Sequence, residues 1–255
     1  MELNTLLQYK PYSTARTEKR ALYAGLLTGL TQFHRERCPE YGRLLDALGC
    51  PAHMDCTVES TPMLPVSLFK ELELRSIPEG EVFKTITSSG TTGQRVSRIF
   101  LDGATSACQQ QALCQIMSDF LGERRLPFLV LDSRQVLRNR AMFSARGAGI
   151  LGFSIFGTRP CYALDEHMEL DLDGVRAFLE EHQGETIFLF GFTFIIWKHV
   201  VRALEERGER LDIPNGILVH GGGWKKLAGE AVSPGEFKAR VAAATGVERV
   251  SKIGR

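Results

Sequence analysis

The sequence predicts an α/β fold in which mixed sheets are flanked by helices. From residue 127 onward, short apolar segments alternate with amphipathic segments of helical spacing, which is the order typical of α/β domains. Earlier in the chain, two β-branched segments bracket a loop of small residues, which predicts a further pair of strands. At 255 residues and 44% hydrophobic content, the chain can build one large domain or two smaller ones.

The first part of the chain is predicted to be helical. Apolar residues at helical spacing predict a helix over 14–37, and a second, short helix over 41–48 ends at Gly49. Pro62 and Pro65 then force an extended, turning path into a short amphipathic piece.

A loop rich in glycine and hydroxyl groups joins the next two predicted strands. The strands are "EVFKTIT" (81–87) and "RVSRIFL" (95–101). A helix over 106–121 follows them, and Gly122 ends that helix.

The second half of the chain alternates between strands and helices. Its predicted strands are 127–132, 153–157, 161–165, 186–191, 215–223 and 247–253. Its predicted helices are 136–151, 172–182, 194–207 and a last one that begins after Ser233 and ends at Gly246. Ser233 followed by Pro234 and Glu236 is a typical helix start, with a capping hydroxyl and a glutamate that closes the box.

Charge and hydropathy argue against two classes of partner. The net charge is +1, from 31 Lys plus Arg against 30 Asp plus Glu, which gives no electrostatic reason to expect nucleic acid. The longest apolar run, 187–197, is interrupted by Gly191 and Thr193 and is shorter than the about 20 residues that span a bilayer. The first residues contain no sustained apolar stretch of the secretory kind, so we expect no membrane span and a cytoplasmic protein.

The six cysteines are expected to be free thiols rather than a disulfide framework. "CPAHMDC" places His53 between Cys50 and Cys56, but the candidates for a fourth ligand, Cys38 and His34, do not lie at a standard zinc spacing. We therefore predict no metal site from these residues.

The loop "TSSGTTGQR" (87–95) admits two interpretations. Serine, threonine and glycine are common in surface turns. The same residues also suit a phosphate, because glycine lets the backbone approach while hydroxyl and N–H groups donate hydrogen bonds. The loop lacks the G-x-x-x-x-G-K-[ST] pattern, and a predicted strand rather than a helix follows it.

Several segments resemble one family in order along the chain. "SSGTTG" is similar to the signature loop [ST]-[SG]-G-[ST]-[ST]-G of adenylate-forming enzymes. "LPVSLFKELEL" (64–74), "FGFTFIIWKHV" (190–200) and "ILVHGGGWKKL" (217–227) resemble the acyl-protein synthetases, the long-chain fatty acid–luciferin-component ligases. The resemblance extends from about residue 10 onward and implies the large N-terminal domain of an adenylate-forming enzyme.

The resemblance implies a reaction, its cofactors and its partners. Such enzymes use ATP and Mg²⁺ to convert a fatty acid to an acyl-adenylate and pyrophosphate. The acyl group then passes to a cysteine of the synthetase and on to a reductase subunit, which makes the aldehyde. The expected partners are therefore a fatty acid and an acyl-CoA or fatty acid reductase subunit.

The resemblance also implies which residues bind ATP. The expected phosphate ligands are Ser88, Ser89, Gly90, Thr91, Thr92, Gly93 and Arg98. Arg98 stands close to where many relatives have a lysine, and the alternative for it is a solvated strand residue. The expected adenine contacts are Gly221, Gly222, Gly223 and Trp224. For Trp224 the alternative is a core tryptophan.

The acid-binding side is expected at "FGFT". Gly191 would allow close approach, Phe192 would form an apolar wall, and Thr193 would supply a polar contact. An aromatic run at the start of a helix is also common in plain hydrophobic cores, and that alternative stays open.

The sequence departs from the family pattern at its end. The resemblance calls for a Tyr-Gly-[Met/Leu]-[Thr/Val]-Glu element whose Glu helps to hold Mg²⁺, then a ribose-binding Asp, a catalytic Lys and an acyl-accepting Cys. All of these would lie beyond Arg255, so we expect a C-terminally truncated member whose catalytic residues are unknown. We expect a helical segment over 1–60 and a partial adenylate-forming domain over 61–255, or one continuous domain over 1–255.

Two alternatives to the fatty acid–protein ligase remain at this stage. The signature loop is shared with acyl- and aryl-coenzyme A ligases, which differ in the thiol that accepts the acyl group. A truncated chain could also be a non-catalytic remnant that binds a nucleotide or an acyl group.

Overall fold

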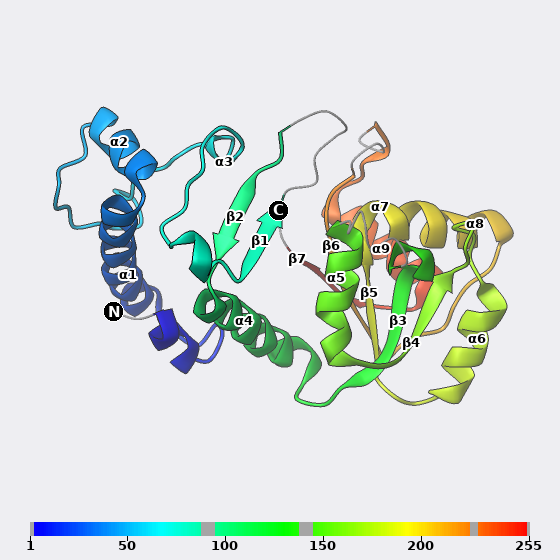
Figure 1. The fold of residues 1–255 in the computed structure, drawn as a ribbon. Coiled ribbons are helices and arrows are strands. Elements are labelled where there is room, and N and C mark those ends of the chain that lie inside the picture. Colours follow the sequence, from blue (N-terminus) through cyan, green and yellow to red (C-terminus); the bar gives the residue numbers. More distant parts are fainter. Residues whose placement is uncertain (1–2, 88–94, 138–144, 225–228, 254–255) are drawn as a thin grey trace. The chain divides into compact units, whose positions relative to one another are not determined.

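The structure is a computed structural model in which the chain forms two compact units, Met1–Gly122 and Glu123–Arg255 (Figure 1). The described residues are 3–87, 95–137, 145–224 and 229–253. Within them, no helix is both long and apolar enough to cross a membrane. The division into a helical segment over 1–60 and a partial adenylate-forming domain over 61–255 stays a prediction.

Unit 1 combines helices with one strand pair. Its elements are η1 (Leu3–Gln8), α1 (Arg16–Arg37), α2 (Pro39–Ala47), α3 (Leu68–Glu71), η2 (Glu79–Glu81), β1 (Lys84–Thr87), β2 (Arg98–Leu101) and α4 (Gly103–Leu121). The strands are antiparallel, with Lys84 opposite Leu101 and Thr87 opposite Arg98. The helices α1 and α2 and the strand pair therefore lie where the sequence predicted two helices and two strands. The helix expected from residue 106 begins earlier, because the Asp102 carboxylate caps it by accepting from the Thr105 amide.

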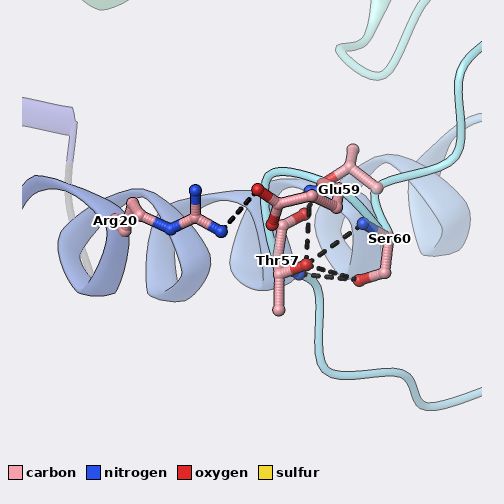
Figure 2. A network of polar contacts seen from close by, with 5 residues as sticks. Arg20, Thr57, Glu59 and Ser60 are labelled. Atoms are coloured by element: carbon pink, nitrogen blue, oxygen red, sulfur yellow. Dashed lines mark hydrogen bonds and ion pairs between the residues drawn. The ribbon is translucent and has the colours of Figure 1, made fainter. Parts of the chain in front are cut away.

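A hydrogen-bonded turn lies beside α1. The amide of Thr57 donates to Ser60 Oγ at 2.8 Å, and the amide of Ser60 donates back to Thr57 Oγ1 at 3.1 Å. Figure 2 shows these bonds together with the ion pair between Arg20 of α1 and Glu59 in the turn. Both charged side chains are about half exposed, so the pair positions the turn more than it stabilises the fold.

Unit 2 is built on a parallel sheet, which has five strands in the described residues. They are β3 (Leu126–Ser133), β4 (Gly157–Leu164), β5 (Ile187–Phe192), β6 (Gly216–Gly221) and β7 (Arg249–Ile253). Their order across the sheet is β4-β3-β5-β6-β7, and each neighbouring pair is parallel. β4 and β7 therefore form the two edges (Figure 1).

Helices cover both faces of this sheet. The connecting elements are η3 (Arg134–Leu137), α5 (Ala145–Phe153), η5 (Ser154–Phe156), α6 (Leu172–Glu181), α7 (Thr193–Ile195), η6 (Ile196–Val201), α8 (Arg202–Arg207) and α9 (Pro234–Thr245). Because side chains alternate along a strand, Phe128 and Leu129 belong to opposite faces. Phe128 stacks on Phe188, and Phe153 of α5 stacks on Phe190, at ring distances of 4.8 and 4.3 Å. Leu129 belongs to the other layer, with side chains from α6, η6, α8 and α9.

The structure confirms the α/β class and the alternation of elements in unit 2. Ser233 caps α9 as expected, with its hydroxyl accepting from the amide of Glu236 at 3.1 Å. The strand expected over 153–157 is wrong, because that segment ends α5 and forms the turn η5. Phe153 and Phe156 lie three residues apart, which puts both on one side of such a turn, with their ring centres 6.0 Å apart.

The helix expected over 136–151 is also corrected. Residues 134–137 form the 3₁₀ turn η3. The α-helix described in this segment is α5, Ala145–Phe153.

Two neighbouring glycines of unit 2 should respond in opposite ways to alanine. A Cβ on Gly157 would lie 2.5 Å from Cβ of Phe128, whereas a Cβ on Gly152 in α5 meets nothing within 4 Å. We expect Gly157→Ala to lower the free energy of unfolding by about 1–3 kcal/mol through overpacking. Gly152→Ala should leave it unchanged or raise it by up to about 1 kcal/mol. Urea unfolding of both variants tests this, and equal effects would contradict the packing at Phe128.

Candidate active site at the carboxyl edge of the parallel sheet

The carboxyl edge of the unit 2 sheet is where a ligand site is expected on physical grounds. β4 lies on one side of β3, whereas β5 and the later strands lie on the other side. The connections therefore diverge at the boundary between β3 and β5, and open α/β sheets bind ligands outside the strand ends at such a point. Ser133 and Phe192 end these two strands.

Two of the segments singled out from the sequence meet at this edge. The strand register places Phe192 opposite Gly221. The buried hydroxyl of Thr193 lies 3.0 Å from the carbonyl oxygen of Gly221 and 3.1 Å from that of Gly222. It also lies 3.0 Å from Nδ1 of His220. A hydroxyl has one proton, so it donates to one carbonyl and can accept the Nδ1 proton of His220. Thr193 thus holds the turn that follows β6.

That turn presents bare backbone. Gly222 has φ +72°, a conformation that favours glycine, and its Cβ position would lie 3.0 Å from Cδ1 of Phe192. Gly223 is exposed, and no atom lies within 4 Å of its Cβ position. The peptide groups at Gly223 are therefore open to a flat ligand, whereas the ring of Phe192 lies against Gly222. The adenine role of this turn remains a prediction.

Gly191 is explained by packing. A Cβ at Gly191 would lie 2.9 Å from Cβ of Leu131 and 3.1 Å from Cγ1 of Ile196. The glycine therefore lets β5 and the helix after it approach β3 closely. Its proposed part in acid binding is not needed to account for the residue, and it stays a prediction.

Trp224 belongs to an aromatic cluster beside the turn. It is half-buried, and its ring packs edge-on against Trp197 at 5.3 Å and against Phe237 at 6.2 Å. Both partners belong to the main hydrophobic core of unit 2, and Trp224 packs against that core. This contact fits the core alternative weighed from the sequence, while the exposed part of the ring leaves an adenine contact as a prediction.

His220 is neutral at ordinary pH. It is buried between the Thr193 hydroxyl and the ring of Phe237, whose centre lies 4.7 Å away. Burial lowers the pKa of His220 to about 4, with smaller contributions from the positive charges of Lys252 and Lys238. A neutral imidazole next to the turn suits a role in hydrogen bonding rather than in charge neutralisation.

An ion pair at the end of β3 was missed from the sequence. The Asp132 side chain is completely buried, and Nε of Arg146 donates to Oδ2 of Asp132 at 3.0 Å. Nη2 of Arg146 donates to the other carboxylate oxygen, so the pair is bidentate. Oδ1 of Asp132 also accepts from the amide of Ser133 at 2.7 Å. The available signal was an aspartate that closes the buried run "PFLVLD" at the carboxyl end of a strand.

His199 lies in η6, a π-helical turn inside the helix that follows β5. Its Nδ1 lies 2.8 Å from the carbonyl oxygen of Met168, so Nδ1 carries the proton and Nε2 is left as an acceptor. Burial lowers the pKa of His199, and the positive charges of Lys198 and Arg146 add to this effect. π-helical turns occur often at functional sites. No residue pattern in the sequence pointed to His199.

The phosphate-loop residues Ser88–Gly93 lie outside the described residues, and their role stays a prediction. Arg98 is described in β2 of unit 1, where it is about half exposed. Its Nη2 lies 3.6 Å from Oε2 of Glu73, and its guanidinium carbon lies 5.8 Å from the ring centre of Phe100. Arg98 therefore has a carboxylate partner in this structure, and an arriving phosphate would compete with it.

The side chains that could bind metal or carry an acyl group are dispersed. In the described part of the chain, no group of three or more His, Cys, Asp or Glu residues could hold a metal ion. All six cysteines lie in that part and are free thiols. Burial raises the pKa of Cys161 to about 11, with a smaller contribution from the negative charge of Asp171. That thiol is protonated at neutral pH and is a poor nucleophile.

Comparison with known proteins gives these features a family. The family described as "Acyl-protein synthetase, LuxE" matches residues 2–254, nearly the whole chain. The chain belongs to this family. The resemblance inferred from the sequence motifs is confirmed.

A curated relative and solved structures extend the comparison. The long-chain-fatty-acid–luciferin-component ligase of Vibrio harveyi is 22% identical over 233 residues, which cover 89% of this chain and 59% of the relative. An open conformation of 2-hydroxyisobutyryl-CoA ligase, in complex with 2-HIB-AMP and CoA, has a TM-score of 0.60 at 15% identity. That match covers 96% of this chain and 54% of the ligase. The same ligase in the thioesterification state also has a TM-score of 0.60, at 18% identity, with coverage of 94% and 49%.

The similar proteins support the fold of this chain but match it over only part of their own length. The solved structures support the fold, which is that of the adenylate-forming ligases predicted from the sequence. The chain spans about half the length of those structures and 59% of the curated relative. Its activity, substrates and partners are therefore treated as proposals.

His220 should make the stability of this family member depend on pH. Its pKa of about 4 in the folded chain lies below the ordinary value of 6.5, so the unfolded chain binds the proton first as pH falls. The free energy of unfolding should therefore decrease between about pH 6.5 and pH 4, by about 3 kcal/mol from this residue. His220→Asn should flatten that dependence in urea unfolding, whereas His167→Asn, at an exposed position, should not. Parallel pH profiles for wild type and His220→Asn would contradict the assignment.

Arg146 should be far more important for stability than an exposed arginine. Arg146→Met leaves the buried Asp132 charge without its partner, and we expect a loss of about 3–5 kcal/mol in the free energy of unfolding. The matched control is Arg159→Met, which breaks the exposed pair with Glu181 and should change stability little. Urea unfolding distinguishes the two, and a loss below 1 kcal/mol for Arg146→Met would show that Asp132 is not buried as a charge.

Proposed function

We propose that this chain carries out the acid-activating reaction of a long-chain fatty acid–protein ligase. A carboxylate oxygen of the fatty acid attacks the α-phosphorus of ATP. The bond from that phosphorus to the bridging oxygen breaks, and pyrophosphate leaves with the acyl-adenylate as the other product. The observation that carries the proposal is the junction of "FGFT" and "HGGG" through Thr193 at the carboxyl edge, in a chain of the acyl-protein synthetase family.

Each motif has a role under this proposal. Ser88–Gly93 donate hydrogen bonds to the β- and γ-phosphates, and Arg98 adds a positive charge. The turn Gly221–Gly223 receives the adenine against its bare backbone. Thr193 acts as a positioning residue, because its hydroxyl fixes the carbonyls of that turn. Phe192 supplies an apolar wall on the acid side.

Mg²⁺ would neutralise phosphate charge in this chemistry. The described residues offer no cluster of carboxylates, histidines or cysteines that fits it. We therefore assign no step to the metal on these residues.

The second half of the proposed reaction is transfer to a thiol. A cysteine thiolate attacks the acyl carbonyl of the acyl-adenylate, AMP leaves, and the acyl group remains as a thioester. A reductase that takes the acyl group from this thioester would be the partner. The name of the Vibrio harveyi relative, a long-chain-fatty-acid–luciferin-component ligase, supports a fatty acid as the substrate.

The activation step can be measured by fatty-acid-dependent exchange of labelled pyrophosphate into ATP. We expect exchange with the wild-type chain and a loss of about a hundredfold in Thr91→Ala, which removes one donor to the phosphates. Gly222→Asp should abolish exchange, because it puts a side chain and a negative charge into the proposed adenine turn. Gly208→Asp is the matched control. Gly208 also has a positive φ, +63°, but its Cβ position is open and it caps α8.

The outcomes separate the alternatives. Exchange that persists in Gly222→Asp would contradict the adenine role, and absence of exchange from folded wild-type chain would contradict the proposed activity. Adding coenzyme A tests the acceptor. Formation of acyl-CoA in place of a protein thioester would make the chain a coenzyme A ligase.

A further inference from the structure

Unit 1 contains a large apolar cavity that none of the roles above uses. Its volume is about 830 Å³, within the roughly 300–1,000 Å³ typical of small-molecule sites. It lies between α1, the segment 62–77 and β2. Representative lining residues are Leu26, Leu30, Phe33, Phe69, Ile99 and Phe100.

Two polar groups in the cavity wall, His34 and Asp102, already have hydrogen-bond partners. Nδ1 of His34 is hydrogen-bonded to Ser76 Oγ at 2.7 Å, and burial lowers the pKa of His34, which keeps the ring neutral. The Asp102 carboxylate accepts from the amide of Thr105 at the start of α4. The wall therefore offers an apolar surface rather than a site for a buried ion.

Positive charge lies beside one wall of the cavity. The guanidinium carbons of Arg75 and Arg98 each lie 5.8 Å from the ring centre of Phe100, which lines the cavity. Both arginines pair with Glu73, at 3.0 and 3.6 Å. Two guanidinium groups share this one carboxylate, so a net positive charge remains at an aromatic wall of the apolar cavity. That arrangement matches a ligand that has a long apolar tail and an anionic head.

The sequence of α1 keeps this cavity open. Gly29 lies inside the helix, where glycine is less favourable than any other residue except proline. It lines the cavity, and a Cβ there would meet no atom within 4 Å. A larger side chain at this position would fill space that the cavity now leaves empty.

We propose that this cavity binds the hydrocarbon chain of the fatty acid, with the carboxylate directed toward Arg75, which leaves Arg98 for the phosphates. The inference rests on the proposed function for its ligand, and it assigns the acyl tail to unit 1 rather than to the "FGFT" segment alone. It predicts that unit 1 determines which chain lengths are accepted.

Direct binding of saturated fatty acids, without ATP, tests the proposal. Displacement of a fluorescent fatty acid from the full chain should show affinity rising about fourfold per added methylene until the cavity is full. Gly29→Phe should weaken binding at least tenfold by occupying the cavity. Gly29→Ala and Ala21→Phe are the controls, because the first adds one carbon and the second alters an exposed α1 position outside the lining. Equal affinity in Gly29→Phe and wild type would overturn the proposal.

Two further measurements test the proposal if Gly29→Phe fails to fold. Phe69→Ala enlarges the cavity and should shift the preferred acid to a longer chain. A fatty acid with a photoreactive group near its tail should label peptides from 26–41 or 62–77 in the wild-type chain. Labelling confined to residues 123–255 would overturn the proposal even if every variant were destabilised.

Pyrophosphate exchange distinguishes failure here from failure of the proposed function. If Gly29→Phe retains wild-type exchange for all chain lengths, the cavity assignment is wrong while the ligase proposal stands. If fatty acids bind and Gly29→Phe weakens them, but no chain catalyses exchange, the cavity assignment stands and the ligase proposal fails.

Discussion

In a parallel sheet that is covered on both faces, the central strands leave peptide groups free only where they end. In unit 2 the central strands β3, β5 and β6 are buried on both sides, so their hydrogen bonds are satisfied within the sheet. The candidate site forms where that pairing stops. Thr193 contributes there, because its hydroxyl lies within hydrogen-bond distance of the carbonyl oxygens of Gly221 and Gly222 and donates to one of them. At this edge a side chain, rather than a neighbouring strand, holds the backbone of the turn after β6.

Four glycines of the chain illustrate two different physical roles. Gly157 and Gly191 leave no room for a Cβ, and they let a side chain or strand come close. Gly223 and Gly29 have open space around their Cβ positions, one at the end of β6 and one beside the apolar cavity. The first kind stabilises the core by packing. The second kind leaves backbone uncovered and is not needed for packing of the core.

Much of the fold could be predicted because buried parallel strands read as continuous apolar runs, as "PFLVLD" and "TIFLFG" do. Residues 153–157 were predicted wrongly because a short apolar run does not distinguish a strand from a helical turn. The family could be recognised from four segments that occur in order along the chain. The Asp132–Arg146 pair could not, because it depends on how α5 turns back over β3. The packing role of Gly191 could not be predicted either, because the sequence does not show which side chains lie next to a glycine in the fold.

The two edges of the unit 2 sheet differ in what they can accept. On β4, Pro160 has no N–H to donate, and the neighbouring Arg159 has a positive φ of 46°. A new strand could not form a regular ladder along that side. β7 contains no proline, and its described residues have no positive φ. The β7 edge is therefore the more regular of the two for pairing with a further strand. A strand that paired there would join at β7, next to the strand that leads into the glycine turn.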